Sequence, residues 1–165
     1  MGIKRIGRHL LDHHWRVRRI FAPPVLVRIE AAIRAGEATH SGQLRFVVEG
    51  ALDGLPLFRD QRPRERALEV FSHLRIWDTA HNNGVLIYLL LADRDVEIVA
   101  DRGIDAYVGA AGWDNICHDM EAEFRNGQFE AGVINGIAAV SRELAKHFPP
   151  QSPQRNELPD KPVVM

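Results

Sequence analysis

The chain has 165 residues, a length typical of a single domain with one hydrophobic core. Hydrophobic residues make up 45% and charged residues 26%, which is ordinary for a globular protein and argues against general disorder. The 21 Lys and Arg residues nearly balance the 22 Asp and Glu residues, so the net charge of −1 gives no reason to expect nucleic acid as a partner. The longest apolar run, residues 85–92, is far shorter than the ~20 residues of a membrane-spanning helix.

The single cysteine, Cys117, excludes an internal disulfide and any cysteine-rich zinc site. The basic N-terminus is interrupted by further charged residues, and no apolar stretch with a small-residue cleavage site follows it. The sequence therefore predicts no secretory signal. These features favour a soluble protein in the cytoplasm.

The first predicted element is an amphipathic helix over residues 3–21, within an N-terminal segment of residues 1–22. Apolar residues recur along one side of this helix, while the other side carries six Lys or Arg residues and one Asp. Two interpretations remain open. The apolar side could pack on the core, or residues 1–21 could lie on an anionic membrane surface as a peripheral contact. We favour packing on the core.

The main predicted domain, residues 23–148, alternates helices and strands. In chain order we expect a helix over 24–36, a buried strand over 43–49, a helix over 63–74, two strands over 85–92 and 96–100 that form a hairpin, and two helices that contain 113–124 and 129–144. This order gives one parallel crossover and one antiparallel edge strand. The predicted fold class is therefore α/β, a small α/β/α sandwich whose sheet is mixed and mostly parallel, with one hairpin strand at its edge.

The remaining segment, residues 149–165, contains five of the nine prolines of the chain and few apolar anchors. Proline-rich segments of this kind seldom pack against a core. We therefore expect residues 149–165 to form a mobile or extended tail.

Acidic and histidine side chains gather where the two hairpin strands begin and end. Asp78 and His81 precede the first of these strands, and Asp101 and Asp105 follow the second. Because the strands are antiparallel, both groups lie at the same edge of the sheet, where Asn82 or Asn83 could add further oxygen atoms. Oxygen-rich loops suit hard cations, so the four side chains predict a site for calcium or magnesium.

Several alternatives to this site remain open. Asp78 could form an ordinary turn, and Asp101 could pair with a nearby arginine at the surface. His40 and Glu49 flank the first strand and are weaker candidates, since a strand end of this type is commonly a solvated terminus. Phosphate-loop, dinucleotide, zinc-protease and kinase motifs are missing from the sequence, so no organic cofactor is indicated.

The string Asn-Asn-Gly-Val-Leu-Ile at 82–87, followed by a hairpin and by Gly-Ile-Asp at 103–105, resembles the TPM domain family. The family is named for a thylakoid lumen protein, a photosystem repair protein and a membrane protein that modulates acetylcholine receptors. The order of the elements is similar over residues 24–148. The resemblance implies an α/β/α sandwich, and it links the chain to divalent metal binding, weak acid phosphatase activity and the assembly or repair of membrane complexes. Asp101 and Asp105 stand where the family usually has Gly and Glu.

Two functions remain open for this short, soluble, bacterial-type branch. The first is a TPM-type module that binds a divalent metal or a protein partner, in the assembly or maintenance of membrane-associated complexes. The second is a weak metal-dependent acid phosphatase, with His81 as the candidate acid or base and Asp78, Asp101 and Asp105 as metal ligands. The sequence shows no arranged phosphate clamp or nucleophile–base pair, so we favour the first function and leave open whether the protein is an enzyme.

Overall fold

A four-stranded sheet organises the part of the chain that the computed structural model describes, residues 14–52, 61–152 and 155–165. The helices are α2 (His14–Ile20), α3 (Pro23–Glu37), α5 (Pro63–His73), α6 (Arg102–Arg125) and α7 (Phe129–His147). The strands are β1 (Gln43–Glu49), β2 (Gly84–Leu90), β3 (Asp95–Ala100) and β4 (Val163–Val164).

The strands lie in the order β3-β2-β1-β4. The β1–β2 pair is parallel, and the chain between these strands crosses over through α5, as a parallel connection requires. The β2–β3 pair is an antiparallel hairpin, and β4 adds a short parallel strand on the far side of β1. The predicted small α/β fold with a mixed, mostly parallel sheet and one hairpin edge is confirmed.

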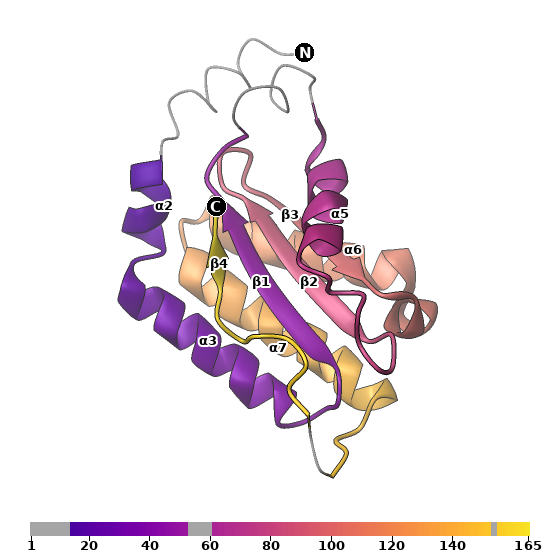
Figure 1. The fold of residues 1–165 in the computed structure, drawn as a ribbon. Helices are drawn as coiled ribbons and strands as arrows, with labels where there is room; N and C mark the ends of the chain where they lie inside the picture. The colour runs from indigo at the N-terminus through magenta and orange to yellow at the C-terminus, as the bar shows by residue number, and fades with distance from the viewer. Residues whose placement is uncertain (1–13, 53–60, 153–154) are drawn as a thin grey trace.

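Helices cover both faces of the sheet (Figure 1). Helices α3, α6 and α7 supply the larger core on one face, where Phe46 and Ile87 of the sheet meet Val133 and Ile137 of α7. The other face packs mainly against α5. Every residue of β1 and β2 is buried, and these strands read in the sequence as nearly continuous apolar runs because both of their faces are covered.

The described part of the basic N-terminal helix packs on this core. Val17 and Phe21 are 1% and 2% exposed, and the Phe21 ring lies 5.9 Å from the ring of Phe46. Trp15 is 56% exposed, and the neighbouring Arg18 and Arg19 also face solvent. The apolar side of α2 therefore packs against the core. Residues 3–13 of the predicted helix lie outside the described residues.

The C-terminal segment differs from the mobile tail that the sequence predicts. Leu158 and Asp160 are both 9% exposed, and β4 pairs with Val47 and Val48 of β1. Gln43 supplies the reason, since its Oε1 accepts the backbone N–H groups of Glu157 at 2.7 Å and Leu158 at 2.8 Å. The segment is extended as expected, but it is docked because a buried polar side chain of β1 satisfies its backbone donors.

The outer edge of β3 is occupied by side chains from two helices. Glu121 of α6 accepts the backbone N–H of Val96 at 3.4 Å. Arg64 of α5 donates to the carbonyl oxygen of Ile98. The backbone groups that face away from β2 at these two positions therefore already have partners.

Helix α6 begins at Arg102, well before the apolar positions from Trp113 onward that predicted it. Gly109 has φ 68° and ψ 169°, so the helical path is interrupted there and the apolar period of the later part does not extend into the earlier part. Such a positive φ is accessible to glycine at little cost. Across the described ranges, none of the helices combines the length and apolar character needed to cross a membrane.

Candidate functional site

The two segments that the sequence predicted to be neighbours do lie side by side. The N–H of Gly103 donates to the carbonyl oxygen of Asn82 at 2.9 Å, and the N–H of Asp101 donates to the carbonyl oxygen of Gly84 at 2.9 Å. A Cβ atom at Gly103 would lie only 2.4 Å from the Asn82 oxygen, so glycine is what permits this close approach. The predicted juxtaposition of the loop before β2 and the start of α6 is confirmed.

Two buried oxygen atoms at this junction have no hydrogen-bond donor among the described residues. One is Asp101 Oδ2, whose companion Oδ1 accepts the N–H of Arg102 at 2.7 Å. The other is Asn83 Oδ1, in a side chain that is fully buried and whose Nδ2 donates to the carbonyl oxygen of Ser41 at 3.2 Å. Buried acceptors without donors are costly, so each of these atoms indicates a place where a cation or a water molecule is bound.

The other predicted ligands do not join Asp101. Asp105 Oδ1 accepts the indole N–H of Trp113 at 2.9 Å, which directs this carboxylate into the groove between β3 and α6. His81 lines a different hollow, and Asp78 is exposed. Within residues 14–52, 61–152 and 155–165, no group of three or more His, Cys, Asp or Glu side chains is arranged to hold a metal ion. The structure therefore does not gather the four predicted side chains into one cluster.

The hollow beside His81 has a volume of about 320 Å³ and is bordered by the C-terminal segment. Ser41, Arg155 and Glu157 also line it, and the Glu157 carboxylate accepts the N–H of Ala80 at 3.1 Å. The imidazole of His81 can transfer a proton, and the guanidinium of Arg155 supplies a positive charge in the same hollow. Arg155 and Glu157 were not expected here, because they are more than 70 residues from His81 and no local pattern brings them together.

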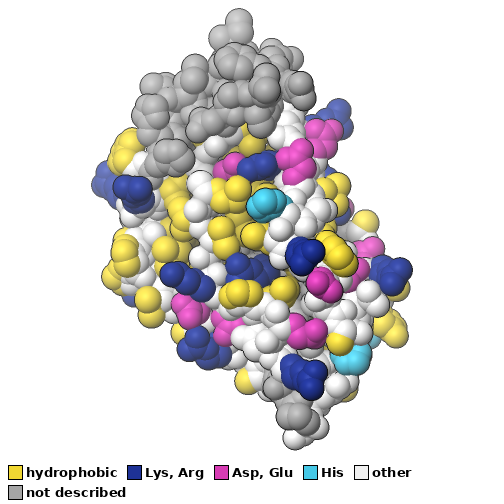
Figure 2. All heavy atoms as spheres, viewed as in Figure 1, with side chains coloured by type: hydrophobic (Ala, Val, Ile, Leu, Met, Phe, Trp, Pro, Cys, Tyr) yellow, Lys and Arg dark blue, Asp and Glu magenta, His cyan; other side chains and the backbone are white. Residues whose placement is uncertain are grey.

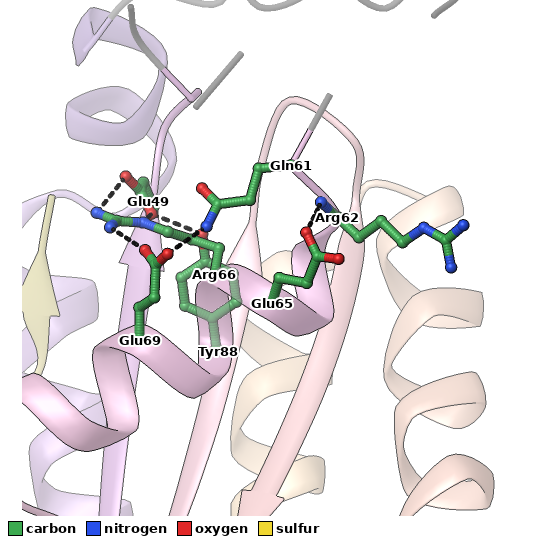
Figure 3. A network of polar contacts seen from close by, with 7 residues as sticks. All are labelled: Glu49, Gln61, Arg62, Glu65, Arg66, Glu69 and Tyr88. Atoms are coloured by element: carbon green, nitrogen blue, oxygen red, sulfur yellow. Dashed lines mark hydrogen bonds and ion pairs between the residues drawn. The ribbon is translucent and has the colours of Figure 1, made fainter. Parts of the chain in front are cut away.

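The carboxyl end of β1 holds a network of polar contacts that is shown in Figure 3. Glu49 is 8% exposed, and its two oxygens accept from Nε and Nη2 of Arg66 at 2.9 and 3.0 Å. The hydroxyl of Tyr88 donates to the same carboxylate at 2.6 Å, and Arg66 also pairs with Glu69. Burial and the adjacent Glu49 raise the pKa of Tyr88, so its hydroxyl stays a donor. Glu49 is neither a solvated strand end nor an open ligand, because this network uses both of its oxygens.

An apolar hollow lies between α5 and β4, on the face that carries the Glu49 network. It has a volume of about 520 Å³, and its lining includes Val70 and Leu74 of α5 and Val163 and Met165 of the C-terminal segment. Figure 2 shows hydrophobic side chains gathered in this region, with charged side chains around them. The hollow exists only because β4 is docked, since two of its lining residues come from the C-terminal segment.

A model of the TPM domain matches residues 19–143, which is most of the chain. The chain belongs to the TPM domain family. The match includes the loop before β2, the β2–β3 hairpin and the start of α6, so the junction of Asn83 and Asp101 lies inside the TPM domain.

Solved structures agree with the TPM assignment. The BA42 protein of the psychrophilic bacterium Bizionia argentinensis is 30% identical to this chain, with a TM-score of 0.75, and the match covers 86% of this chain and 93% of that one. The N-terminal domain of a protein from P. gingivalis is 23% identical, with a TM-score of 0.58 over 73% of this chain and 76% of that one, and shows the shared fold. No curated protein sequence matches this TPM chain.

Proposed function

We propose that this TPM domain is a non-enzymatic module that binds a divalent cation, calcium or magnesium, where the loop before β2 meets the start of α6. The observation that carries the proposal is the pair of buried oxygens, Asp101 Oδ2 and Asn83 Oδ1, that have no donor within the described residues. Hard cations bind carboxylate and amide oxygens. Asp105 and His81 stand on the same two segments, but the Asp105 carboxylate is bonded to Trp113 and His81 lines a different hollow, so neither is part of the proposed site. The partner that such a module would serve, in a membrane-associated complex, stays a prediction from the family.

The cation proposal is tested by thermal unfolding of chelator-stripped protein with and without millimolar CaCl₂ or MgCl₂. A ligand of the native state raises the melting temperature by mass action. We expect a rise for the wild type and for Asp119→Asn, an exposed control on α6, and no rise for Asp101→Asn. Asparagine is also a good helix N-cap, so Asp101→Asn removes the charge with little loss of capping.

A melting temperature that neither cation changes would refute the cation proposal, because the buried oxygens would then be satisfied by water. The same conclusion follows if Asp101→Asn and Asp119→Asn respond alike. Isothermal titration with each chloride salt supplies the stoichiometry, which should be one cation per chain.

One observation favours a second function, the hydrolysis of phosphate monoesters at acid pH. His81 lines the same hollow as Arg155 and Ser41. The imidazole of His81 would then act as an acid or base beside the guanidinium of Arg155, which is suited to bind a phosphate group. Turnover of an aryl phosphate by the wild type should then fall at least tenfold in His81→Gln and stay unchanged in His118→Gln, an exposed histidine of α6. Equal rates in the two variants would assign the activity to another site or to a contaminant.

A further inference from the structure

Charged side chains that are almost fully buried hold the C-terminal strap, which we define as residues 155–165. Glu37 at the end of α3 is 6% exposed, Arg45 of β1 is 7% exposed and Asp160 of the strap is 9% exposed. Ionisable groups are rarely buried to this degree unless they are paired. The contacts of these three residues therefore act together with those of Gln43 to keep the strap docked.

The geometry places two carboxyl groups against each other in this cluster. Glu37 Oε1 accepts the N–H of Leu44 at 2.8 Å, and the Glu37 carboxyl also hydrogen-bonds to the carboxyl of Asp160. A carboxyl–carboxyl hydrogen bond requires a proton, so the pair carries one negative charge and not two. Asn156 supplies a further donor, with its Nδ2 at 2.6 Å from Asp160 Oδ1.

The positive charges around Glu37 and Asp160 are consistent with a carboxyl pair that holds one proton and carries one negative charge. Arg45 donates to the carbonyl oxygen of Pro159 and lies close enough to favour a negative charge on Glu37 and Asp160. The Nε of Arg34 lies 3.3 Å from Asp160 Oδ2, although the Arg34 side chain is 67% exposed. His40, which lies between α3 and β1, is a further buried titratable group, and burial lowers its pKa to about 4, so it is neutral near pH 7. One buried arginine therefore faces the two carboxyl groups.

We propose that the strap is a pH-dependent latch, docked on β1 while Glu37 holds its proton and released when that proton is lost. A second negative charge at this site would repel Asp160 and would remain poorly hydrated while the strap covers it. Release lets water reach both carboxylates. It also opens the edge of β1 at Val47 and Val48, and it removes Arg155 and Glu157 from the hollow beside His81.

The direction of the pH effect follows from the environment of Glu37. Burial is the largest influence on the pKa of Glu37 and raises it, Asp160 also raises it, and the Leu44 N–H and Arg45 lower it. The net effect is a pKa of about 8. The docked state thus binds the proton more tightly than the released state does. Docking is fully stabilised at low pH and weakens as the pH rises from about 4.5 towards 8.

Hydrogen exchange of the full-length chain, read residue by residue by NMR, tests the latch. The amides of Glu157 and Leu158 are bonded to Gln43, and the amide of Met165 is bonded to the carbonyl oxygen of Val48 at 2.9 Å. Their protection factors, which correct for the intrinsic pH dependence of exchange, should fall about tenfold or more between pH 6.5 and pH 9. The amide of Ile87 in the central strand β2 serves as the internal reference and should keep its protection.

Two variants make the result specific to the carboxyl pair. Glu37→Gln keeps a neutral hydrogen-bonding side chain and should keep the strap protected at both pH values, whereas Glu143→Gln on α7 should behave as the wild type does. Asp160→Asn removes the other member of the pair and should reduce the fall in protection. The latch is overturned if wild-type protection is the same at both pH values, or if Glu37→Gln loses protection at pH 9 as the wild type does. A carboxyl ¹³C titration in which Glu37 ionises near pH 4.5 would overturn it as well.

Discussion

The guanidinium of Arg66 on α5 donates hydrogen bonds to both carboxylate oxygens of Glu49, the last residue of β1, at 2.9 and 3.0 Å. The two side chains are only 22% and 10% exposed. This bidentate pair joins the crossover helix to the end of the strand that precedes it in the chain, and Tyr88 on the neighbouring strand completes the contact. The β1–α5–β2 unit is therefore tied together at the carboxyl ends of both parallel strands.

Replacing Arg66 should destabilise the protein strongly. Arg66→Ala leaves a largely buried carboxylate with Tyr88 as its remaining partner, which should cost about 3 kcal/mol in the free energy of unfolding. Arg66→Lys should cost less, because an ammonium group can contact the carboxylate but cannot bridge both oxygens in a plane. Urea denaturation measures each change, with the exposed Arg142→Ala as the control. Equal midpoints for Arg66→Ala and Arg142→Ala would contradict this role.

Gly84, within the string Asn-Asn-Gly-Val-Leu-Ile, should tolerate no side chain. A Cβ atom there would lie 2.0 Å from the carbonyl oxygen of Ile76, a backbone atom that cannot move aside. Gly84→Ala should therefore cost about 3 kcal/mol or prevent folding. Gly112→Ala is the matched control, since its Cβ would meet a side-chain methyl group of Val108 and not a backbone atom. Thermal unfolding compares the two, and similar melting temperatures would show that the loop before β2 can shift.

The buried His40 should make the protein sensitive to acid. It is fully buried, its Nδ1 lies 3.2 Å from the carbonyl oxygen of Gly42, and burial lowers its pKa to about 4. The unfolded chain takes up a proton at this histidine near pH 6.5 and the folded chain does not, so its contribution to stability is lost as the pH falls from about 6.5 towards 4. The loss should reach about 3 kcal/mol.

A comparison of variants isolates this effect from other titrating groups. The difference in unfolding free energy between wild type and His40→Gln should shrink as the pH falls from 7 to 4.5, because glutamine takes up no proton. The exposed His118→Gln should show a constant difference. A wild-type to His40→Gln difference that stays constant over this range would mean that His40 is protonated in the folded protein.

The peripheral contact of residues 1–21 with an anionic membrane stays a prediction, and α2 is the part of that segment that the structure describes. Its core-facing side is occupied by Val17 and Phe21, so contact would rely on the exposed Trp15, Arg18 and Arg19. Each basic residue near an anionic surface contributes about 1 kcal/mol, so replacing Arg18 and Arg19 together by Gln should weaken binding to phosphatidylglycerol vesicles roughly tenfold or more.

Cosedimentation measures this binding, and the fluorescence of Trp15 reports it locally when compared with Trp15→Phe. Neutral phosphatidylcholine vesicles should bind neither form. The pair Arg125→Gln and Arg142→Gln removes the same charge from α6 and α7 and should leave binding unchanged. Absence of binding to anionic vesicles by the wild type would assign α2 to the core alone.

The strands β1, β2 and β3 were predictable from the sequence because each is marked by a local pattern, whereas β4 was not predicted. The apolar runs of β1 and β2 and the polar turn before β3 predict two buried strands and a hairpin without knowledge of distant residues. The meeting of the loop before β2 with the start of α6 followed from the hairpin, since antiparallel strands bring those ends together. Local pattern and strand direction were enough for these features.

The rest depends on contacts between distant residues. The docking of the strap depends on Gln43, which meets Glu157 from 114 residues away, and a polar residue in a strand carries no signal of that partner. Asp105 was expected to face a cation, but the indole N–H of Trp113, eight residues later, donates to one of its oxygens. Asp101, with Asn82 or Asn83, was expected to offer oxygen atoms to a cation, and this stays a prediction. The unsatisfied oxygens of Asp101 and Asn83 could be recognised only once the burial of each atom was known.

The side chains of Arg64 and Glu121 along the outer edge of β3 affect whether copies of this protein can associate through their sheets. A sheet can extend from one molecule to the next when an edge strand has unpaired backbone N–H and C=O groups. A strand that adds to β3 must first displace the Arg64 guanidinium from the carbonyl oxygen of Ile98 and the Glu121 carboxylate from the N–H of Val96. These two contacts therefore oppose strand addition at Val96 and Ile98, although four of the six residues of β3 are hydrophobic.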